Sequence, residues 1–323
     1  MDTGGSAVVR RIVRASPLLA LTGIGLFVGM TFALAGVTPP DAGIYYGASD
    51  FDRLYGHVWL QDGDYVYPPA FAMALWPLRL LGPAGFLIAW TGLLFLALAI
   101  AGRWVAVAFV VAGLVLMPVV GGSTPATLPL QYLLIGNAQA LIPAAIVLGF
   151  RWPGLWSVVL LTKMLPGIGI LWFAVRREWR ALGWAVGVTA LVVLVSILIA
   201  PSAWADYVGF LWANRATPST HELAPVPMWV CLPVAITLIV WGARQDRRWT
   251  LPFACGIASL ALYQWSYVIV WIAAAAFIAP PDIQGQLARL SASGTWLVRS
   301  RARARGLASM AAAGGSLILR LLH

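Results

Sequence analysis

The strongest constraint on this chain is a series of long apolar segments, separated by short segments that carry arginine. Several of them approach the roughly 20 apolar residues that a helix needs to cross a bilayer. Hydrophobic residues make up 61% of the chain and charged residues only 10%, whereas a soluble domain carries about 25% charged residues. A soluble fold could not bury so much apolar surface. We therefore expect an all-α, polytopic transmembrane helical bundle.

The apolar segments predict about ten spans. They are residues 17–37, 67–82, 84–102, 104–120, 131–150, 154–175, 181–200, 228–243, 249–263 and 264–279. Some are short, and the last two are nearly continuous, so broken or re-entrant segments are also compatible with the pattern. The first follows Arg10, Arg11 and Arg14 and has no clear cleavage site, which favours an uncleaved span over a signal peptide.

The arginine clusters predict the orientation of the bundle. Arginines gather at 176–180, at 244–248 and in the tail after residue 281, and such clusters mark cytoplasmic segments. With ten spans, both termini are cytoplasmic and the two longest loops, 38–66 and 201–227, lie outside. Arg103 and Arg151 would then also lie outside, which is a mild conflict.

We accordingly predict a multi-pass cell-membrane protein with a membrane domain at 1–280 and a basic cytoplasmic tail at 281–323. The tail is either solvated or an amphipathic helix on the inner leaflet. The net charge of +10 follows this orientation pattern and does not indicate nucleic acid as a partner.

The sequence lacks the common motifs for metal binding, ATP binding and proteolysis. Cys231 and Cys255 lie in apolar segments and are expected to be buried thiols, and no Cys/His metal spacing is present. We predict no metal and no cofactor. The chain also lacks a Walker A motif, H-E-x-x-H and G-x-S-x-G, which argues against an ATP-driven pump or a membrane protease of those classes.

The loop 38–66 combines carboxylates with aromatic residues, a composition that suits carbohydrate. Asp41 stands where the first span meets this loop, so it is a candidate general base or, alternatively, a helix-capping residue. The other candidate substrate-binding residues of the loop and its border are Tyr45, Tyr46, Asp50, His57 and Tyr67. An ordinary solvated loop is the competing interpretation.

Lys163 is the only lysine, and it lies inside an apolar segment. A charge at the centre of a span costs roughly 2.5–3.5 kcal/mol on insertion scales and is usually functional. A phosphate group is one partner that would offset this cost. The alternative is a lysine that reaches the interface, helped by a helix break at Pro166.

Two further polar groups are candidates for ligand binding. Asn137 and Gln139 stand near the start of a span, where amides bind a ligand or bond neighbouring helices. Arg215 and His221, in loop 201–227, are candidate phosphate ligands on the same side as loop 38–66. A lone histidine in a loop is, however, often simply exposed.

Six short motifs follow one another along the chain. They are D-x-x-x-Y-Y-x-A from Asp41 to Ala48, Y-P-P from Tyr67 with P-L at Pro77, G-N-A-Q from Gly136 to Gln139, K-M-L-P from Lys163 to Pro166, R-R-E-W-R from Arg176 to Arg180, and S-A-W-A-D-Y from Ser202 to Tyr207. In this order they resemble the GT87 glycosyltransferases, a polytopic family of the GT-C type that includes mannosyltransferases of mycobacteria. The resemblance covers roughly residues 10–230.

The resemblance implies a membrane glycosyltransferase. It would move a hexose, with mannose as the family's example and arabinose still open, from a polyprenyl-phosphate sugar to a lipid or glycan acceptor on the outer face. Asp41 matches the family's catalytic carboxylate and would deprotonate the acceptor, with inversion at the anomeric carbon. Lys163, with Arg215 or His221, would bind the donor phosphate.

Two other classes of protein remain compatible with the sequence. One is a transporter or lipid flippase, and the other is a non-catalytic relative that binds membrane lipids. A polar cavity that opens to the outer leaflet beside Asp41 would favour the enzyme, and a cavity at the midplane would favour a transporter.

Overall fold

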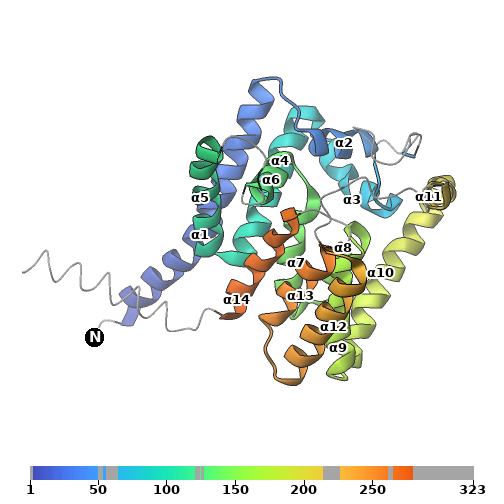
Figure 1. The fold of residues 1–323 in the computed structure, drawn as a ribbon. Coiled ribbons are helices and arrows are strands. Elements are labelled where there is room, and N and C mark those ends of the chain that lie inside the picture. Colours follow the sequence, from blue (N-terminus) through green and yellow to red (C-terminus); the bar gives the residue numbers. More distant parts are fainter. Residues whose placement is uncertain are drawn as a thin grey trace, which may run out of the picture. The chain divides into compact units, whose positions relative to one another are not determined.

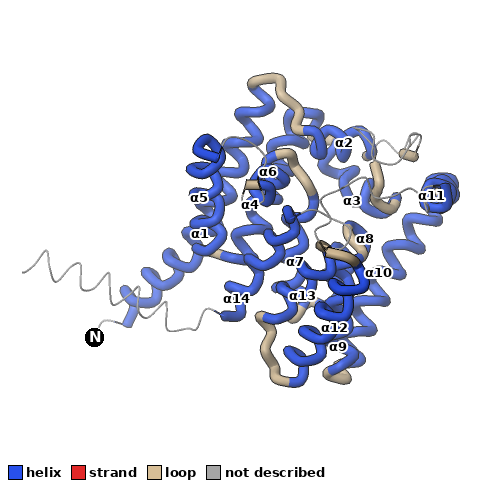
Figure 2. The backbone as a smooth tube through the Cα atoms, in the orientation of Figure 1, coloured by secondary structure: helices blue, strands red, loops and turns tan. Residues whose placement is uncertain are grey.

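The computed structural model describes residues 3–49, 54–55, 65–120, 124, 127–213, 226–260 and 265–278, with side chains omitted for 3–14, 120 and 265–266. All regular structure in these ranges is helical, as predicted (Figures 1 and 2). The chain divides into two units, Met1–Phe277 and Ile278–His323. The helices belong to the first unit, except for the last residue of α14. The membrane domain at 1–280 and the cytoplasmic tail at 281–323 stay predictions.

The helices follow one another with short connections. In chain order they are α1 (Thr3–Leu34), α2 (Pro40–Ala48), α3 (Pro69–Arg79), α4 (Gly82–Gly102), α5 (Trp104–Val120), α6 (Leu128–Leu134), η1 (Ala138–Ala140), α7 (Leu141–Gly149), η2 (Pro153–Leu155), α8 (Trp156–Thr162), η3 (Leu165–Ile170), α9 (Leu171–Val175), α10 (Trp179–Ile199), α11 (Pro201–Ala213), α12 (Met228–Arg244), α13 (Thr250–Ser259), η4 (Trp265–Ala274) and α14 (Ala275–Ile278).

Helices α1 and α4 form an antiparallel pair whose contact depends on glycine. A Cβ at Gly25 would lie 2.7 Å from Cβ of Phe95, and one at Gly29 would lie 2.8 Å from Cα of Ile88. On the opposite helix, Gly92 faces Leu26 in the same way. Small residues of this kind let the backbones of two membrane helices approach closely. The glycines therefore let the second half of α1 pack directly against α4.

Three helices are long and apolar enough to cross a membrane: residues 15–34 of α1, α4 and α10. The bent pair formed by Leu128–Leu134 and Ala138–Gly149, with an angle of 107° between its halves, would make a fourth. The prediction of about ten spans is not confirmed. Prolines and glycines break the other apolar segments into shorter helices, and these breaks carry the polar residues of interest.

The predicted span 67–82 does not run across the bundle. The Tyr67 hydroxyl, just before α3, lies 2.9 Å from the Tyr45 hydroxyl of α2. At the other end of α3, the Arg79 guanidinium donates a 2.9 Å hydrogen bond to the carbonyl oxygen of Tyr46, also in α2. Because both ends of α3 contact α2, this helix lies alongside α2 at one end of the bundle.

The predicted span 154–175 is instead a hairpin. Helices η2 and α8 lead to Lys163, and η3 and α9 return, so that the Phe150 ring lies 6.1 Å from the Phe173 ring between centroids. Lys163 has extended backbone angles (φ −143°, ψ 111°), and Pro166 follows, so α8 ends at Thr162. The break therefore positions Lys163 at the tip of a hairpin.

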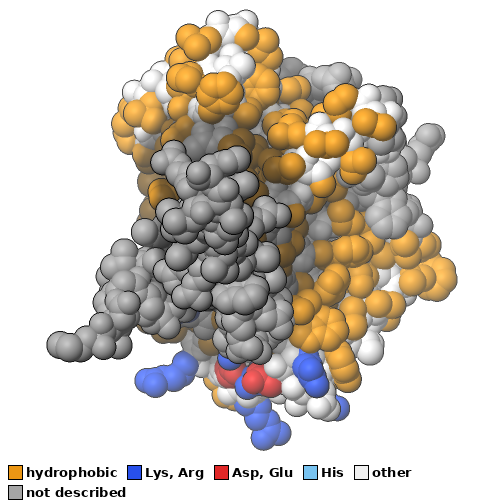
Figure 3. Space-filling model, turned by 90° about the vertical axis from the view of Figure 1, so that its left-hand side faces the viewer, with side chains coloured by type: hydrophobic (Ala, Val, Ile, Leu, Met, Phe, Trp, Pro, Cys, Tyr) orange, Lys and Arg blue, Asp and Glu red, His pale blue; other side chains and the backbone are white. Residues whose placement is uncertain are grey.

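The arginine clusters meet at one end of the bundle. Arg176 donates from Nε to Glu178 at 2.6 Å, lies 3.0 Å from the Asp246 carboxylate and donates to the carbonyl of Ala243 at 3.0 Å. The guanidinium of Arg248 lies 5.0 Å from the ring centroid of Phe150. Arg151, next to Phe150, therefore lies at this arginine end of the bundle, and its predicted place on the outer side is not confirmed. Figure 3 shows Arg, Asp and Glu side chains together at the lower end of the visible described surface and hydrophobic ones above them.

Helix α10 connects the arginine end to the opposite end. It begins directly after the arginines at 176–180, and its 21 residues measure about 30 Å. It leads into α11, whose Tyr207 and Phe210 rings lie 5.3 Å and 5.5 Å from the ring of Tyr55. The Tyr55 hydroxyl donates to the carbonyl of Tyr67 at 2.5 Å. Helices α2 and α3 thus lie at the end of the bundle remote from the arginines.

Candidate active site

Helix α2 carries Asp41 in its first turn. Pro39 has extended ψ (138°) and Pro40 is the first helical residue, a position that suits proline because no backbone N–H is needed there. The N–H of Ala42 donates to the carbonyl of Ile135 at 3.2 Å. Gly136 has φ of +88°, and a Cβ there would lie 2.8 Å from the Ala42 side chain. The break between α6 and η1 is therefore packed directly against the start of α2.

Asn137 in this break contacts Asp41. Its side-chain nitrogen donates to Asp41 Oδ2 at 2.6 Å, and its side-chain oxygen accepts the N–H of Gln139 at 2.9 Å. Because the oxygen is used by a backbone donor, the amide must direct its NH₂ group at the carboxylate. The indole of Trp90 also donates to the carbonyl of Gly136 at 2.7 Å, which fixes the backbone of the break.

Lys163 approaches the same carboxylate from the tip of its hairpin. Lys163 as a whole is half-buried, and its ammonium interacts electrostatically with Asp41 and lies 4.7 Å from the centroid of the Tyr67 ring. A cation at this distance from an aromatic face gains a cation–π attraction. An acid, an amide and a cation from three separate chain breaks therefore converge at one place.

The environment of Asp41 alters its acidity. Burial raises the pKa of the carboxyl group above its ordinary value, while the Asn137 hydrogen bond and the Lys163 charge act in the opposite direction and offset part of the rise. A carboxylate with a raised pKa is a stronger base than an exposed one, yet the two partners keep it ionisable. These properties suit a general base.

Tyr45 is 1% exposed, so no face of its ring is open to a sugar. Its hydroxyl accepts the N–H of Ala138 at 3.2 Å and lies 2.9 Å from the Tyr67 hydroxyl. Tyr45 thereby connects the break that carries Asn137 with the tyrosine beneath Lys163. This geometry favours a positioning role over the predicted direct contact with substrate.

The other predicted site residues have different surroundings. Tyr46 is half-buried, and the Arg79 guanidinium lies 4.9 Å from its ring centroid. Tyr67 and Gln139 are buried, at 5% and 0% exposure. Asp50, His57, Arg215 and His221 lie outside the described residues, and their roles stay predictions.

Two residues connected to this site were not singled out from the sequence. Trp90 is a buried residue of α4 whose apolar surroundings in the sequence gave no sign of its hydrogen bond to the chain break. Tyr132 of α6 interacts electrostatically with Asp41. The only available signal was its place in the polar-flanked segment QYLLIGN, five residues before Asn137.

No group of three or more His, Cys, Asp or Glu residues suited to a metal ion occurs within the described ranges. Both cysteines are buried free thiols.

A family model described as Glycosyltransferase family 87 matches residues 65–317. The chain belongs to glycosyltransferase family 87. Membership indicates a glycosyltransferase, which needs a sugar donor and an acceptor. No curated protein and no solved structure gives a significant match. The GT87 match includes Asn137 and Lys163 but begins after Asp41, so the candidacy of Asp41 depends on its contacts with these two residues.

Proposed function

We propose that this protein transfers a hexose, with mannose as the first candidate, from a polyprenyl-phosphate sugar to a hydroxyl of a lipid or glycan acceptor. The single observation that carries the proposal is the convergence of Asn137 and Lys163 on Asp41. It unites a base with a cation suited to phosphate, inside a chain that belongs to a glycosyltransferase family.

In this mechanism Asp41 accepts the proton of the acceptor hydroxyl as the oxygen attacks the anomeric carbon. The bond from that carbon to the phosphate oxygen breaks, and the electron pair leaves with the lipid phosphate. Attack from the face opposite the phosphate inverts the anomeric centre. General-base assistance of this kind contributes about 10²–10⁴-fold to a rate.

Lys163 would stabilise the departing phosphate. Its ammonium is fixed over Tyr67 and beside Asp41, so little reorganisation is needed when charge develops on the leaving group. Asn137 would orient the carboxylate through its 2.6 Å hydrogen bond and leave Oδ1 of Asp41 available for the acceptor. Arg215 and His221 remain candidates for further phosphate contacts.

We further propose that the reaction takes place on the outer face of the cell membrane. Arginine-rich ends of membrane proteins face the cytoplasm. Helix α10 separates the arginine end from the end where α11 meets the tyrosines near Asp41. A site at one end of the bundle supports transfer at a membrane surface better than transport through the midplane.

The test uses purified protein in nanodiscs, labelled polyprenyl-phosphate mannose and a membrane lipid extract. We expect labelled product from the unaltered protein and at least about a hundredfold less from Asp41→Asn. Asp246→Asn is the matched control, because Asp246 is an exposed acid at the arginine end, and it should leave the rate unchanged. A polyprenyl-phosphate arabinose arm tests the sugar. Equal product from Asp41→Asn and the unaltered protein would remove Asp41 as the base.

A further inference from the structure

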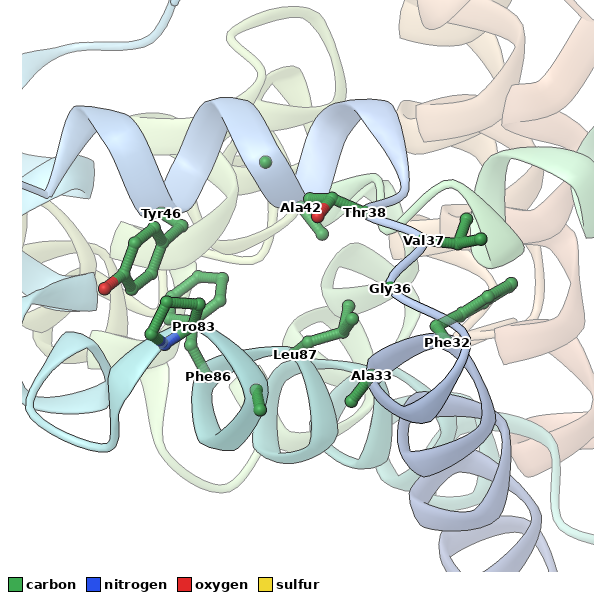
Figure 4. A pocket seen from close by; sticks show the side chains of 12 residues that line it. Phe32, Ala33, Gly36, Val37, Thr38, Ala42, Tyr46, Pro83, Phe86 and Leu87 are labelled. Carbon is green, nitrogen blue, oxygen red and sulfur yellow. The ribbon is translucent and has the colours of Figure 1, made fainter.

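An apolar pocket lies beside the candidate active site, on another face of α2 from Asp41. Its volume is about 320 Å³. Figure 4 shows its three walls: the C-terminal end of α1 and the residues after it, one face of α2, and the first turns of α4. Phe32, Val37, Phe86 and Leu87 are the large aliphatic and phenylalanine side chains among its lining residues.

Small residues create the hollow space. Ala33 and Gly36 stand at the end of α1, Ala42 on α2, and Ala84 at the start of α4. The backbone at Gly36 has φ of +66°, and nothing lies within 4 Å of the position that its Cβ would take. The chain thus turns away from α1 without a side chain that fills the space.

The pocket adjoins the reactive carboxylate. Thr38 and Ala42 line it, and they flank Asp41 in the sequence. Ala42 also donates its N–H to the carbonyl of Ile135, in the break that carries Asn137. The candidate base and one wall of the pocket therefore share the first turn of α2.

The position and apolar lining of the pocket favour a hydrocarbon chain as its occupant. Both α1 and α4 are candidate membrane spans, so the pocket lies where two spans reach the end of the bundle. Val37 is 50% exposed and Ala84 is exposed, so the pocket is open to its surroundings at its border. An apolar hollow at this depth is filled favourably by alkyl or isoprenoid groups and unfavourably by water.

We propose that this pocket binds the first isoprenoid units of the lipid-phosphate donor, with the phosphate at Lys163 and the sugar at Asp41. The proposal rests on the proposed function and deepens it by assigning a path to the lipid chain. Ordinary phospholipid acyl chains share the same chemistry, and a dialkyl phosphate probe separates them from the isoprenoid chain of the donor.

The test is photolabelling, which needs no turnover. Protein in phosphatidylcholine nanodiscs is irradiated with a polyprenyl phosphate that bears a diazirine in its first isoprenoid unit, and labelled peptides are mapped by mass spectrometry. A dialkyl phosphate with a diazirine at the matching depth forms the second arm. Ala84→Trp fills the pocket, and Ala190→Trp makes the same change on an exposed position of α10.

We expect labels on the ends of α1 and α4 with the polyprenyl probe. Ala84→Trp should lower this labelling about tenfold, because it excludes several methylene equivalents from an apolar site, and Ala190→Trp should not. Unchanged labelling in Ala84→Trp, labels elsewhere, or equal labelling by the dialkyl phosphate would overturn the proposal. Asp41→Asn should label normally, so pocket labelling without sugar transfer would count against the proposed reaction and not against the pocket.

Discussion

The side-chain amide of Asn137 donates a 2.6 Å hydrogen bond to the carboxylate of Asp41, across 96 residues of sequence. Asn137 can do so because its own oxygen is occupied by the N–H of Gln139. This contact joins the start of α2 to a break between two half-helices. It turns two separate sequence motifs into parts of one site.

Replacing Asn137 by leucine should displace the acid limb of the pH–rate profile to higher pH. The hydrogen bond from Asn137 lowers the pKa of Asp41, so its loss raises that pKa further. Because the base must be ionised to act, activity then appears only at higher pH. A hydrogen bond to a charged group is worth about 1.5–3 kcal/mol, which corresponds to roughly one to two pH units. Initial rates measured from pH 4 to 9 test this, and an unshifted acid limb would show that Asp41 does not titrate as the base.

Replacing Lys163 by methionine should lower kcat/KM for the lipid-phosphate donor by about 10²–10³-fold, the usual effect of removing one preorganised group that stabilises developing charge. It should also move the acid limb to higher pH, because the Lys163 charge lowers the pKa of Asp41. Lys163→Arg is the control that retains the charge and should recover part of the rate. Equal values of kcat/KM for Lys163→Met and Lys163→Arg would show that the positive charge at this position does not contribute to donor use.

Replacing Tyr45 by phenylalanine should lower stability by about 1–3 kcal/mol, since the buried N–H of Ala138 loses its acceptor. The ring and its packing remain. We expect a lower Tm and faster hydrogen exchange in residues 136–140. Tyr46→Phe removes a hydroxyl that forms no hydrogen bond within the described ranges and serves as the matched control. Equal Tm values for the two variants would contradict the positioning role of Tyr45.

Replacing Gly29 by valine should separate α1 from α4. The new Cβ would lie 2.8 Å from Cα of Ile88, which is backbone and cannot rotate away. Overpacking of this kind costs about 1–3 kcal/mol, so the Tm in detergent should fall. Gly23→Val places the same side chain in the same helix, where nothing lies within 4 Å, and should leave the Tm nearly unchanged. Similar losses for both would indicate an effect of valine on the helix itself.

A cysteine in place of Arg151 should be labelled from the same side of the membrane as one in place of Arg177. The contact between Arg248 and Phe150 positions both at the arginine end, whereas ten crossings would separate them. The test uses a variant without Cys231 and Cys255 in intact cells, with membrane-impermeant maleimide before and after permeabilisation. If position 151 but not position 177 is labelled before permeabilisation, the result would support the predicted ten-span topology.

The sequence by itself determined that the chain is a helical membrane protein of the GT87 type, because hydropathy and short motifs are local properties. It also singled out Asp41, Asn137 and Lys163, since polar residues in apolar surroundings are costly and therefore conspicuous.

Only the tertiary structure decided how these residues meet. Hydropathy depends on how many apolar residues follow one another, and it carries no information on the direction that the chain takes. For this reason α3 and the hairpin around Lys163 were predicted as spans. The positive φ of Gly136, the extended backbone of Lys163 and the packing of α3 against α2 change the direction of the chain. Tyr45 was predicted to touch substrate, yet its burial depends on contacts with Tyr67 and Ala138, which are distant in sequence. The reason is physical: a side chain's exposure and partners depend on long-range packing, which no local pattern encodes.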